Sequence, residues 1–219
     1  MQNIPRIFLN QDLTPGKSFP VDKDTVHYLR RVMRRNDCLV FNNGVEYSAV
    51  LSDDDKYITI GNKTEHTDPS NNLILCFAPI KKIEDLLNMA TQMGVSVLQP
   101  IITKRTVANH INWTRQQKII IEASEQSGRN SVPQLLPPIK FEDLDLSNCI
   151  VADERAAHDK DFKESRISNS KILIGPEGGF APEEFEKMDK AGVEKISLGK
   201  TVLRAEVAAI VAIAKVLDK

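Results

Sequence analysis

The residues best suited to chemistry stand in a glycine-rich stretch, residues 175–180, between an apolar run and a helical pattern. Glycine has no Cβ, so its backbone can approach a ligand closely. The spacing matches neither phosphate-binding glycine pattern, and no Lys-Ser/Thr follows it. Glu177 inside the stretch also disfavours a phosphate. We therefore predict a backbone-lined pocket for a neutral or cationic small molecule; the alternative is a tight turn packed by glycines.

A strand and a helix must position this loop. The apolar residues 171–174 predict a buried strand, and Pro182 suits the first turn of a helix. Ligands of open α/β folds lie beyond the carboxyl ends of strands, where such loops occur. Residues 195–208 repeat the order: a short strand ends at Gly199, and a helix runs from about Arg204 to Val216. Two neighbouring loops of this kind would form the walls of one pocket.

These two stretches resemble the 16S rRNA uridine-N3 methyltransferase family (RsmE) of the SPOUT class. The family pattern is Ile-Gly-Pro-Glu-Gly-Gly-Phe followed by Leu-Gly-x-x-Ile-Leu-Arg-x-Glu-Thr-Ala, and Val207 stands here in place of its Thr. The resemblance covers nearly the whole chain, through blocks in one order. The matching residues are 174–180, Leu198, Gly199, Leu203, Arg204, Glu206 and Ala208, with blocks 5–8, 27–34, 93–95, 104–105 and 122–130.

The resemblance implies an α/β fold of two domains. Residues 1–70 would form a small PUA-like β-barrel that docks RNA. Residues 71–219 would form a SPOUT-type, mostly parallel α/β methyltransferase domain, whose C-terminal trefoil knot holds the cofactor. It also implies a homodimer with the knot region at the interface, and 16S rRNA or the small ribosomal subunit as partner.

The resemblance further implies S-adenosylmethionine as cofactor and transfer of its methyl group to N3 of a uridine. Arg204 and Glu206 are the candidate catalytic residues: Arg204 to hold the uridine anion or its phosphate, Glu206 to accept the proton or to orient Arg204. The alternative is a structural pair anchoring the loop. The candidate cofactor-binding residues are Ile174, Gly175, Gly178, Gly179, Leu198, Gly199, Val202 and Leu203.

Arginines supply the candidate RNA contacts. In residues 26–35 the apolar positions 26, 29 and 32/33 predict a helix, and four arginines without an acid occupy its other flanks. Their planar fork suits phosphate, although a solvated helix face is the alternative. The other candidates are a strand-end arginine and two residues behind a helix. The complete set is Arg30, Arg31, Arg34, Arg35, Arg105, Arg129 and Asn130.

Secondary-structure patterns divide the chain in the same way. Residues 1–70 predict short strands at 7–9, 39–41, 47–51 and 57–60, with turns at 42–44 and 53–55 and a polar linker at 66–72. From residue 73 strands and helices alternate, which predicts a mostly parallel sheet with helices on both faces. The strands are expected at 73–79, 97–102, 149–152 and 171–174, and the helices at 82–93, 113–127 and around 156–164.

Composition excludes several classes of protein. No apolar run approaches the ~20 residues of a membrane helix, and the N-terminus lacks the pattern of a signal peptide. The three cysteines are odd in number and far apart, so we expect buried thiols in a reducing cytoplasm and no metal site.

The net charge is −1, but residues 73–140 carry 8 basic and 4 acidic side chains. RNA contacts should therefore lean on that middle part.

Two other functions stay open. A SPOUT enzyme with another RNA target, such as a tRNA ribose 2′-O-methyltransferase, would carry an Asn-x-Gly-x-x-x-Arg segment where this chain has Lys81-Lys82-Ile-Glu-Asp-Leu. A non-catalytic RNA-binding module would not need the intact glycine loops. Loss of S-adenosylmethionine binding would support that last alternative.

Overall fold

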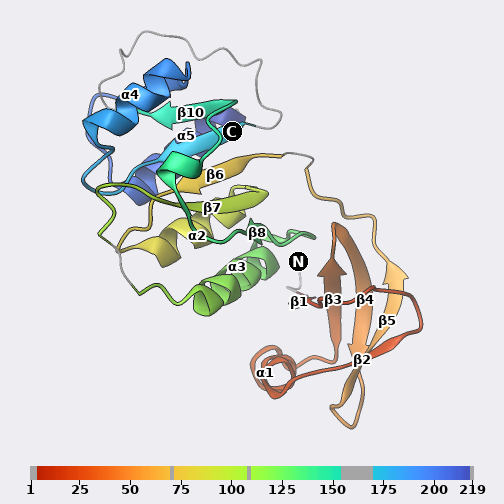
Figure 1. Ribbon diagram of the computed structural model, residues 1–219. Helices are drawn as coiled ribbons and strands as arrows, with labels where there is room; N and C mark the ends of the chain where they lie inside the picture. Colours follow the sequence, from red (N-terminus) through yellow and green to blue (C-terminus); the bar gives the residue numbers. More distant parts are fainter. Residues whose placement is uncertain (1–3, 70–71, 108–109, 154–169, 218–219) are drawn as a thin grey trace. The chain divides into compact units, whose positions relative to one another are not determined.

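The computed structural model describes residues 4–69, 72–107, 110–153 and 170–217, and it divides into two compact units (Figure 1). The first unit comprises Met1–Pro69 together with Ile121–Val132. The second comprises Ser70–Ile120 and Pro133–Lys219.

The described strands of the first unit form one mixed sheet in the order β1-β3-β4-β5-β2. β1 runs parallel to β3, and the other neighbours are antiparallel. Alternate residues of β4 and β5 enter the core, as expected where only one face of a sheet is covered. The predicted strands are confirmed, whereas β2 was missed because it is short and ends in proline. The bounds are β1 Arg6–Phe8, β2 Ser18–Pro20, β3 Asp37–Asn42, β4 Val45–Leu51 and β5 Tyr57–Lys63.

The predicted helix at 26–35 is different from a regular α-helix. It consists of α1, Lys23–His27, and a π-helix, η1, Tyr28–Met33. The π-helix closes i→i+5 hydrogen bonds, so its winding shifts the apolar stripe expected for 3.6 residues per turn. Leu29 is buried as predicted, but 59% of Val32 is exposed, so its predicted place inside is wrong.

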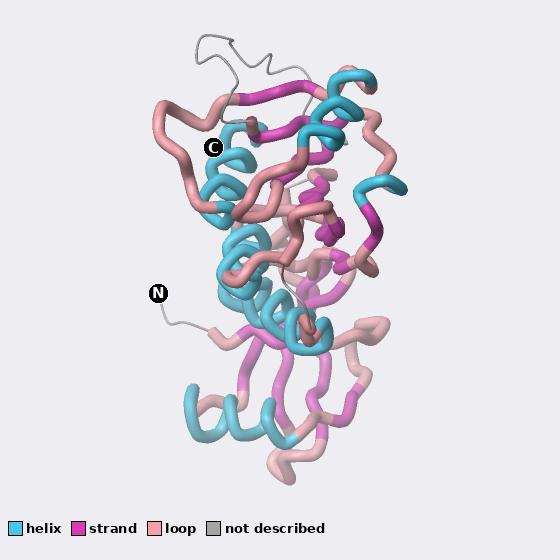
Figure 2. The backbone as a smooth tube through the Cα atoms, turned by 60° about the vertical axis from the view of Figure 1, so that its left-hand side comes forward, coloured by secondary structure: helices cyan, strands magenta, loops and turns pink. Residues whose placement is uncertain are grey.

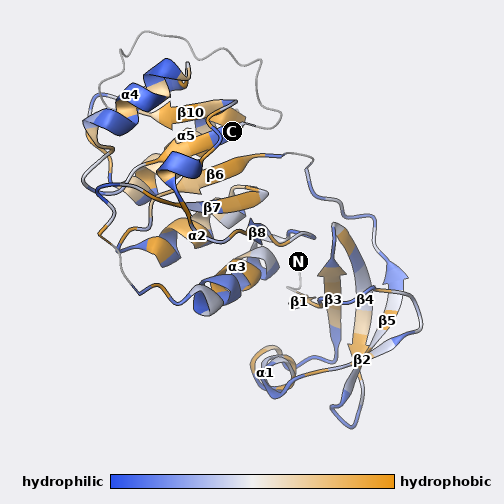
Figure 3. Ribbon diagram, in the orientation of Figure 1, coloured by the Kyte–Doolittle hydropathy of each residue, from blue (hydrophilic) through white to orange (hydrophobic). Residues whose placement is uncertain are grey.

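The second unit contains a parallel sheet, as predicted. Its described strands follow the order β12-β10-β11-β6-β7-β8, with β9 pairing with β7, and every pair is parallel. The central strands are almost wholly apolar (Figure 3) because both faces of the sheet are covered. The bounds are β6 Ile74–Phe77, β7 Val97–Ile102, β8 Gln134–Leu135, β9 Ile139–Lys140, β10 Cys149–Ala152, β11 Lys171–Ile174 and β12 Glu194–Ile196.

Helices lie on either side of these strands (Figure 2). Leu173 of β11 packs in a cluster with Met188 of α4 and Phe141 of the short helix η2, while α5 packs on β11 and α2. The predicted helices at 82–93 and 113–127 are confirmed, and the predicted helical stretch at 156–164 lies outside the described residues. The helix bounds are α2 Ile83–Gln92, α3 Trp113–Ser127, η2 Phe141–Asp143, α4 Pro182–Lys190 and α5 Ala205–Leu217.

This topology places the carboxyl ends of β7, β6, β11 and β10 along one edge of the sheet. The loops that leave those ends are therefore neighbours, and they include the predicted glycine loop. Within the described residues, every helix is too short or too polar to span a bilayer.

Candidate active site

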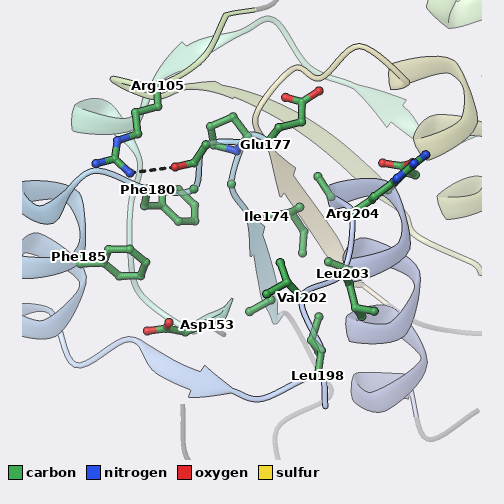
Figure 4. A pocket seen from close by; sticks show the side chains of 18 of the residues that line it. Arg105, Asp153, Ile174, Glu177, Phe180, Phe185, Leu198, Val202, Leu203 and Arg204 are labelled. Carbon is green, nitrogen blue, oxygen red and sulfur yellow. Dashed lines mark hydrogen bonds between the residues drawn. The ribbon is translucent and has the colours of Figure 1, made fainter. Parts of the chain in front are cut away.

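A cavity of about 1180 Å³ lies at this edge, within the second unit (Figure 4). The structure brings all eight predicted cofactor-binding residues, both predicted catalytic residues and Arg105 into its wall. They come from the loops behind β7, β11 and β12 and from the start of α5. The wall combines exposed backbone with apolar side chains, notably Ile174, Leu198, Val202 and Leu203.

The glycines of the wall fall into two kinds. Gly179 and Gly199 have φ of +68° and +129°, a range that favours glycine, and no atom lies within 4 Å of the place where a Cβ would stand. At Gly175 a Cβ would lie 3.1 Å from the Phe180 ring. The first kind leaves open space for a bound group, and the second allows Phe180 to pack beneath the loop.

Loops behind two neighbouring strands hold the glycine loop in place. Behind β6, the Lys81 N–H donates to Oε1 of Glu177 over 3.1 Å. Behind β7, Arg105 Nη1 donates to the Gly178 carbonyl oxygen over 2.9 Å, as drawn in Figure 4. The loop is thus fixed before any ligand binds, which lowers the entropy that binding would cost.

The start of α4 completes this fixation. Glu184 is buried, and its carboxylate accepts from the N–H groups of Lys104 and Ala181, at 2.9 and 2.7 Å. The second bond satisfies a free donor at the helix N-terminus, as a capping box does. A hydrogen bond from Lys104 Nζ lowers the pKa of Glu183. Residues 104–105 therefore support the glycine loop, a role that their sequence position did not reveal.

Arg204 and Glu206 lie at the start of the last helix. Arg204 is exposed, and its side chain forms no hydrogen bond or ion pair with a described residue. Glu206 is 8% exposed, yet its carboxylate also lacks a hydrogen-bonding partner among the described residues. The structural pair considered from the sequence is therefore not formed. Both charged groups remain available to a ligand in the cavity.

Sequence reasoning missed several residues of the wall, above all Asp153. This residue directly follows β10 and is only 3% exposed. Its backbone N–H donates to the Ile196 carbonyl oxygen. An acid placed immediately after a predicted strand was the signal that could have found it. Other lining residues that were not predicted include Lys81, Lys82, Phe180, Pro182, Phe185, Glu186 and Asp189.

The four arginines predicted to contact RNA from residues 30–35 differ in their surroundings. Arg30 donates to Asp55 and Asn36, each over 2.6 Å, and to the Ser52 carbonyl oxygen over 3.0 Å. Arg35 pairs with Asp37, and this hydrogen bond lowers the pKa of that carboxyl. Arg30 therefore joins the helix to the β4–β5 turn. Arg31 and Arg34 are exposed, and their side chains bond to no described residue.

Asn130 is fully buried, which leaves its side chain no surface to offer to RNA. Its Oδ1 accepts from Arg6 over 2.6 Å, and its Nδ2 donates to the His66 carbonyl oxygen over 2.9 Å. Its N–H donates to Asp68 over 2.7 Å. Neighbouring Arg129 is partly buried, and desolvation lowers its pKa. These residues hold the segment behind α3 within the first unit.

The cysteines and acids give no sign of a metal centre. No cluster of three or more His, Cys, Asp or Glu with metal-site geometry occurs in the described part of the chain. All three thiols are buried and free, and burial raises the pKa of Cys38 and Cys76 to about 12 and that of Cys149 to about 11. They are protonated and unreactive at neutral pH.

Comparison with known proteins identifies relatives of this chain that are RNA methyltransferases. A family model described as an RNA methyltransferase domain matches residues 67–217. Ribosomal RNA small subunit methyltransferase E of Rickettsia conorii is 35% identical, covering 96% of this chain and 94% of its own length. The Mesomycoplasma hyopneumoniae protein of the same name is 28% identical, with 96% and 97% covered.

A solved structure supports the same assignment. Ribosomal RNA small subunit methyltransferase E from Neisseria gonorrhoeae, bound to S-adenosyl methionine, has a TM-score of 0.85 at 27% identity. It covers 97% of this chain, which in turn covers 96% of it. The match thus extends over both units as well as the cavity. The chain belongs to the ribosomal RNA small subunit methyltransferase E family of RNA methyltransferases.

Proposed function

We propose that this protein transfers a methyl group from S-adenosylmethionine to N3 of a uridine in the 16S rRNA of the small ribosomal subunit. One observation carries the proposal: the two glycine loops, Arg204 and Glu206 surround one cavity. The family of the chain and the cofactor bound by its Neisseria gonorrhoeae relative support the same reaction.

The residues of the cavity fit that cofactor. Open space beside Gly179 and Gly199 lets a ribose or carboxylate approach the backbone. Ile174, Leu198 and Leu203 offer an apolar wall for the adenine ring. The acids in the wall suit a molecule that carries a positive charge on sulfur and an ammonium group. When bound, the cofactor supplies a methyl group on that sulfonium, an electrophile that requires no metal.

The substrate uridine supplies the nucleophile, and the chain must activate it. Uridine N3 carries a proton, and its lone pair becomes strongly nucleophilic only when that proton leaves. We propose that the buried carboxylate of Glu206 accepts this proton. General-base catalysis of this kind typically raises the reaction rate about 10²–10⁴-fold. The exposed guanidinium of Arg204 then stabilises the uridine anion electrostatically. With the cofactor bound, the proton from N3 would rest on Glu206, and the guanidinium of Arg204 would lie beside the anionic base that receives the methyl group.

We also propose the finer architecture implied by the family. Residues 1–70, assisted by the buried segment around Asn130, would form a PUA-like barrel that docks RNA. Residues 71–219 would form the methyltransferase domain with a C-terminal trefoil knot. Among the four arginines of residues 30–35, the side chains of Arg31 and Arg34 bond to no described residue, and we propose them as the phosphate contacts. A ribosomal RNA substrate implies a cytoplasmic location.

A homodimer is the assembly that we propose. The outer side of α5 is apolar: Val207 is 42% exposed, and Ile210, Val211 and Ala214 follow on the same side, partly exposed. Positions i, i+3, i+4 and i+7 form one helical stripe. Sedimentation velocity tests it: Val211→Glu should shift the protein from dimer to monomer, and a wild-type monomer would contradict the proposal.

The decisive experiment is mass spectrometry of nucleosides from 16S rRNA. A strain lacking this protein should lose N3-methyluridine. The wild-type chain and a Lys200→Ala control, altered outside the cavity wall, should restore it. Arg204→Ala and Glu206→Gln should not. Unchanged N3-methyluridine in the deletion strain would overturn the proposal and direct attention to tRNA, and failure to bind S-adenosylmethionine would favour a non-catalytic module.

A further inference from the structure

A second, smaller cavity lies wholly within the first unit. Its volume is about 260 Å³, below the ~300 Å³ at which sites for drug-sized ligands begin. The start of β1, the π-helix η1 and the end of α3 form its walls, which are mostly polar. The size suits a single aromatic ring of a nucleotide better than a complete cofactor.

The π-helix directs two side chains into this cavity. Tyr28 and Met33 are five residues apart and both line it. In an α-helix two such residues point about 140° apart, whereas i→i+5 winding stacks them on one face. π-Helical turns are rare and occur frequently at functional sites. The winding that exposes Val32 therefore also presents an aromatic ring and a thioether side by side.

Arg6 provides a rigid hydrogen-bond donor. Its Nη2 donates to the Arg129 carbonyl oxygen and to Asn130, and it pairs with Glu46 over 3.0 Å. The guanidinium also lies 4.8 Å from the centre of the Phe41 ring. Nη1 forms none of these bonds and faces Gly128, where a Cβ would stand 3.3 Å away. Because the other contacts fix the side chain, this edge is held at the cavity.

Glu125 provides a rigid acceptor in the same cavity wall. Its Oε1 accepts from the Phe8 N–H over 2.9 Å, and its Oε2 accepts no hydrogen bond from a described residue. Burial raises the pKa of this carboxyl group, although the Phe8 bond and Arg6 oppose the shift. Glu125 is partly buried and lines the cavity, so its unpartnered Oε2 is within reach of a donor group on a ligand. Gln126, exposed beside it, adds an amide.

We propose that this cavity binds one unpaired pyrimidine base of the substrate RNA. Arg6 and Gln126 donate to ring acceptors, Glu125 accepts from the ring N–H of uracil or the amino group of cytosine, and Tyr28 stacks on the base. Aromatic stacking and edge hydrogen bonds are the usual means of reading single-stranded RNA. The cavity shares no lining residue with the larger one, so we assign it to a base other than the methylated one.

The ligand assignment rests on the proposed function, because it takes the partner to be RNA. Fluorescence anisotropy tests it with the full chain, without methyl donor, and with nine-nucleotide RNAs of adenosine that carry a central uridine, cytidine or abasic site. The wild type should prefer uridine or cytidine over the abasic site by about 10-fold, the lower range of base stacking on aromatic residues. Which pyrimidine binds more tightly identifies the base.

Glu125→Gln keeps the acceptor for Phe8 but turns the other oxygen into an N–H donor, so the preference should fall several-fold while stacking on Tyr28 persists. Glu122→Gln, an exposed change on the same helix, should leave it intact. Gln126→Ala changes an exposed residue of the same cavity and should also reduce the preference for the pyrimidine RNAs. It provides the test if the Glu125→Gln variant does not fold. Equal binding of all three RNAs by the wild type, or no binding, would overturn the proposal. Methyl transfer to small subunits is a separate assay, so a failure of the proposed function would show there instead.

Discussion

Arg105 donates a hydrogen bond of 2.9 Å to the carbonyl oxygen of Gly178. This bond joins the loop behind β7 to the predicted cofactor loop behind β11, and Arg105 carbons also lie 3.7 Å from the Cβ position of Gly178. An arginine predicted to contact RNA thus supports the wall of the cavity.

Arg105→Ala should weaken S-adenosylmethionine binding about 10-fold in the absence of RNA, because a hydrogen bond from a charged donor contributes about 1.5–3 kcal/mol. Isothermal titration calorimetry measures this directly. Lys104→Ala is the matched control, since it removes only the exposed ion pair with Glu183 and keeps the backbone bond to Glu184. If the variant bound the cofactor with unchanged affinity but bound RNA more weakly, Arg105 would instead be a residue that contacts RNA.

Gly199→Ala should lower the free energy of unfolding by about 1–3 kcal/mol, because alanine at φ +129° is strained even where space is open. Gly178→Ala is the control: no positive φ is required there, and the nearest atoms lie at an ordinary 3.7 Å. Urea denaturation of both variants checks the difference. Equal stability of the two would show that the backbone at Gly199 relaxes without cost.

Arg31→Gln and Arg34→Gln should each weaken RNA binding and reduce the slope of log K against log salt by about 0.7, the value for one contact to a single strand. Arg30→Gln should act differently, lowering thermal stability, because Arg30 bonds to Asp55, Asn36 and Ser52. Anisotropy across a salt series and thermal melts separate these effects. A salt slope unchanged in the first two variants would rule out phosphate contacts.

Glu125→Gln should stabilise the protein at pH 7. Burial, together with Glu122 and Asp22, raises the pKa of Glu125 above its ordinary value of 4.5, and Arg6 acts against this. A raised carboxyl pKa means that the folded state gains stability from the protonated form below pH 4.5 and loses it as pH rises through the folded pKa. The advantage of the variant should therefore vanish below pH 4.5, as urea titrations at several pH values would reveal. A constant difference across that range would refute the shift.

The sequence predicted the elements of both units and the wall of the larger cavity because these depend on local patterns. Apolar runs such as residues 171–174 and the glycines behind them act within a few neighbours. The structural role of Arg30 depends on hydrogen bonds to Ser52 and Asp55, which lie more than twenty residues away in the sequence. A local sequence pattern cannot reveal partners at that distance. Asn130 is similar, since its bonds to Arg6 and His66 span 124 and 64 residues.

The π-helix shows a different limit of sequence reasoning. The apolar residues of 26–35 recur with an α-helical period, which placed Val32 on the buried face. The π-helical hydrogen-bond register instead leaves Val32 exposed. Asp153 was within reach of prediction, because it directly follows a strand whose bounds were predicted correctly.

The first unit is built from two stretches of chain separated by about fifty residues, Met1–Pro69 and Ile121–Val132. Glu125, Asn130 and Ser131 of the second stretch bond to Phe8, Arg6 and Asp68 of the first. This unit is therefore not portable: a fragment that ends at residue 70 lacks the groups that saturate its own interior. A transfer of this unit to another protein must therefore include both stretches, because a gene cut at the linker would separate two segments that complete each other's hydrogen bonds.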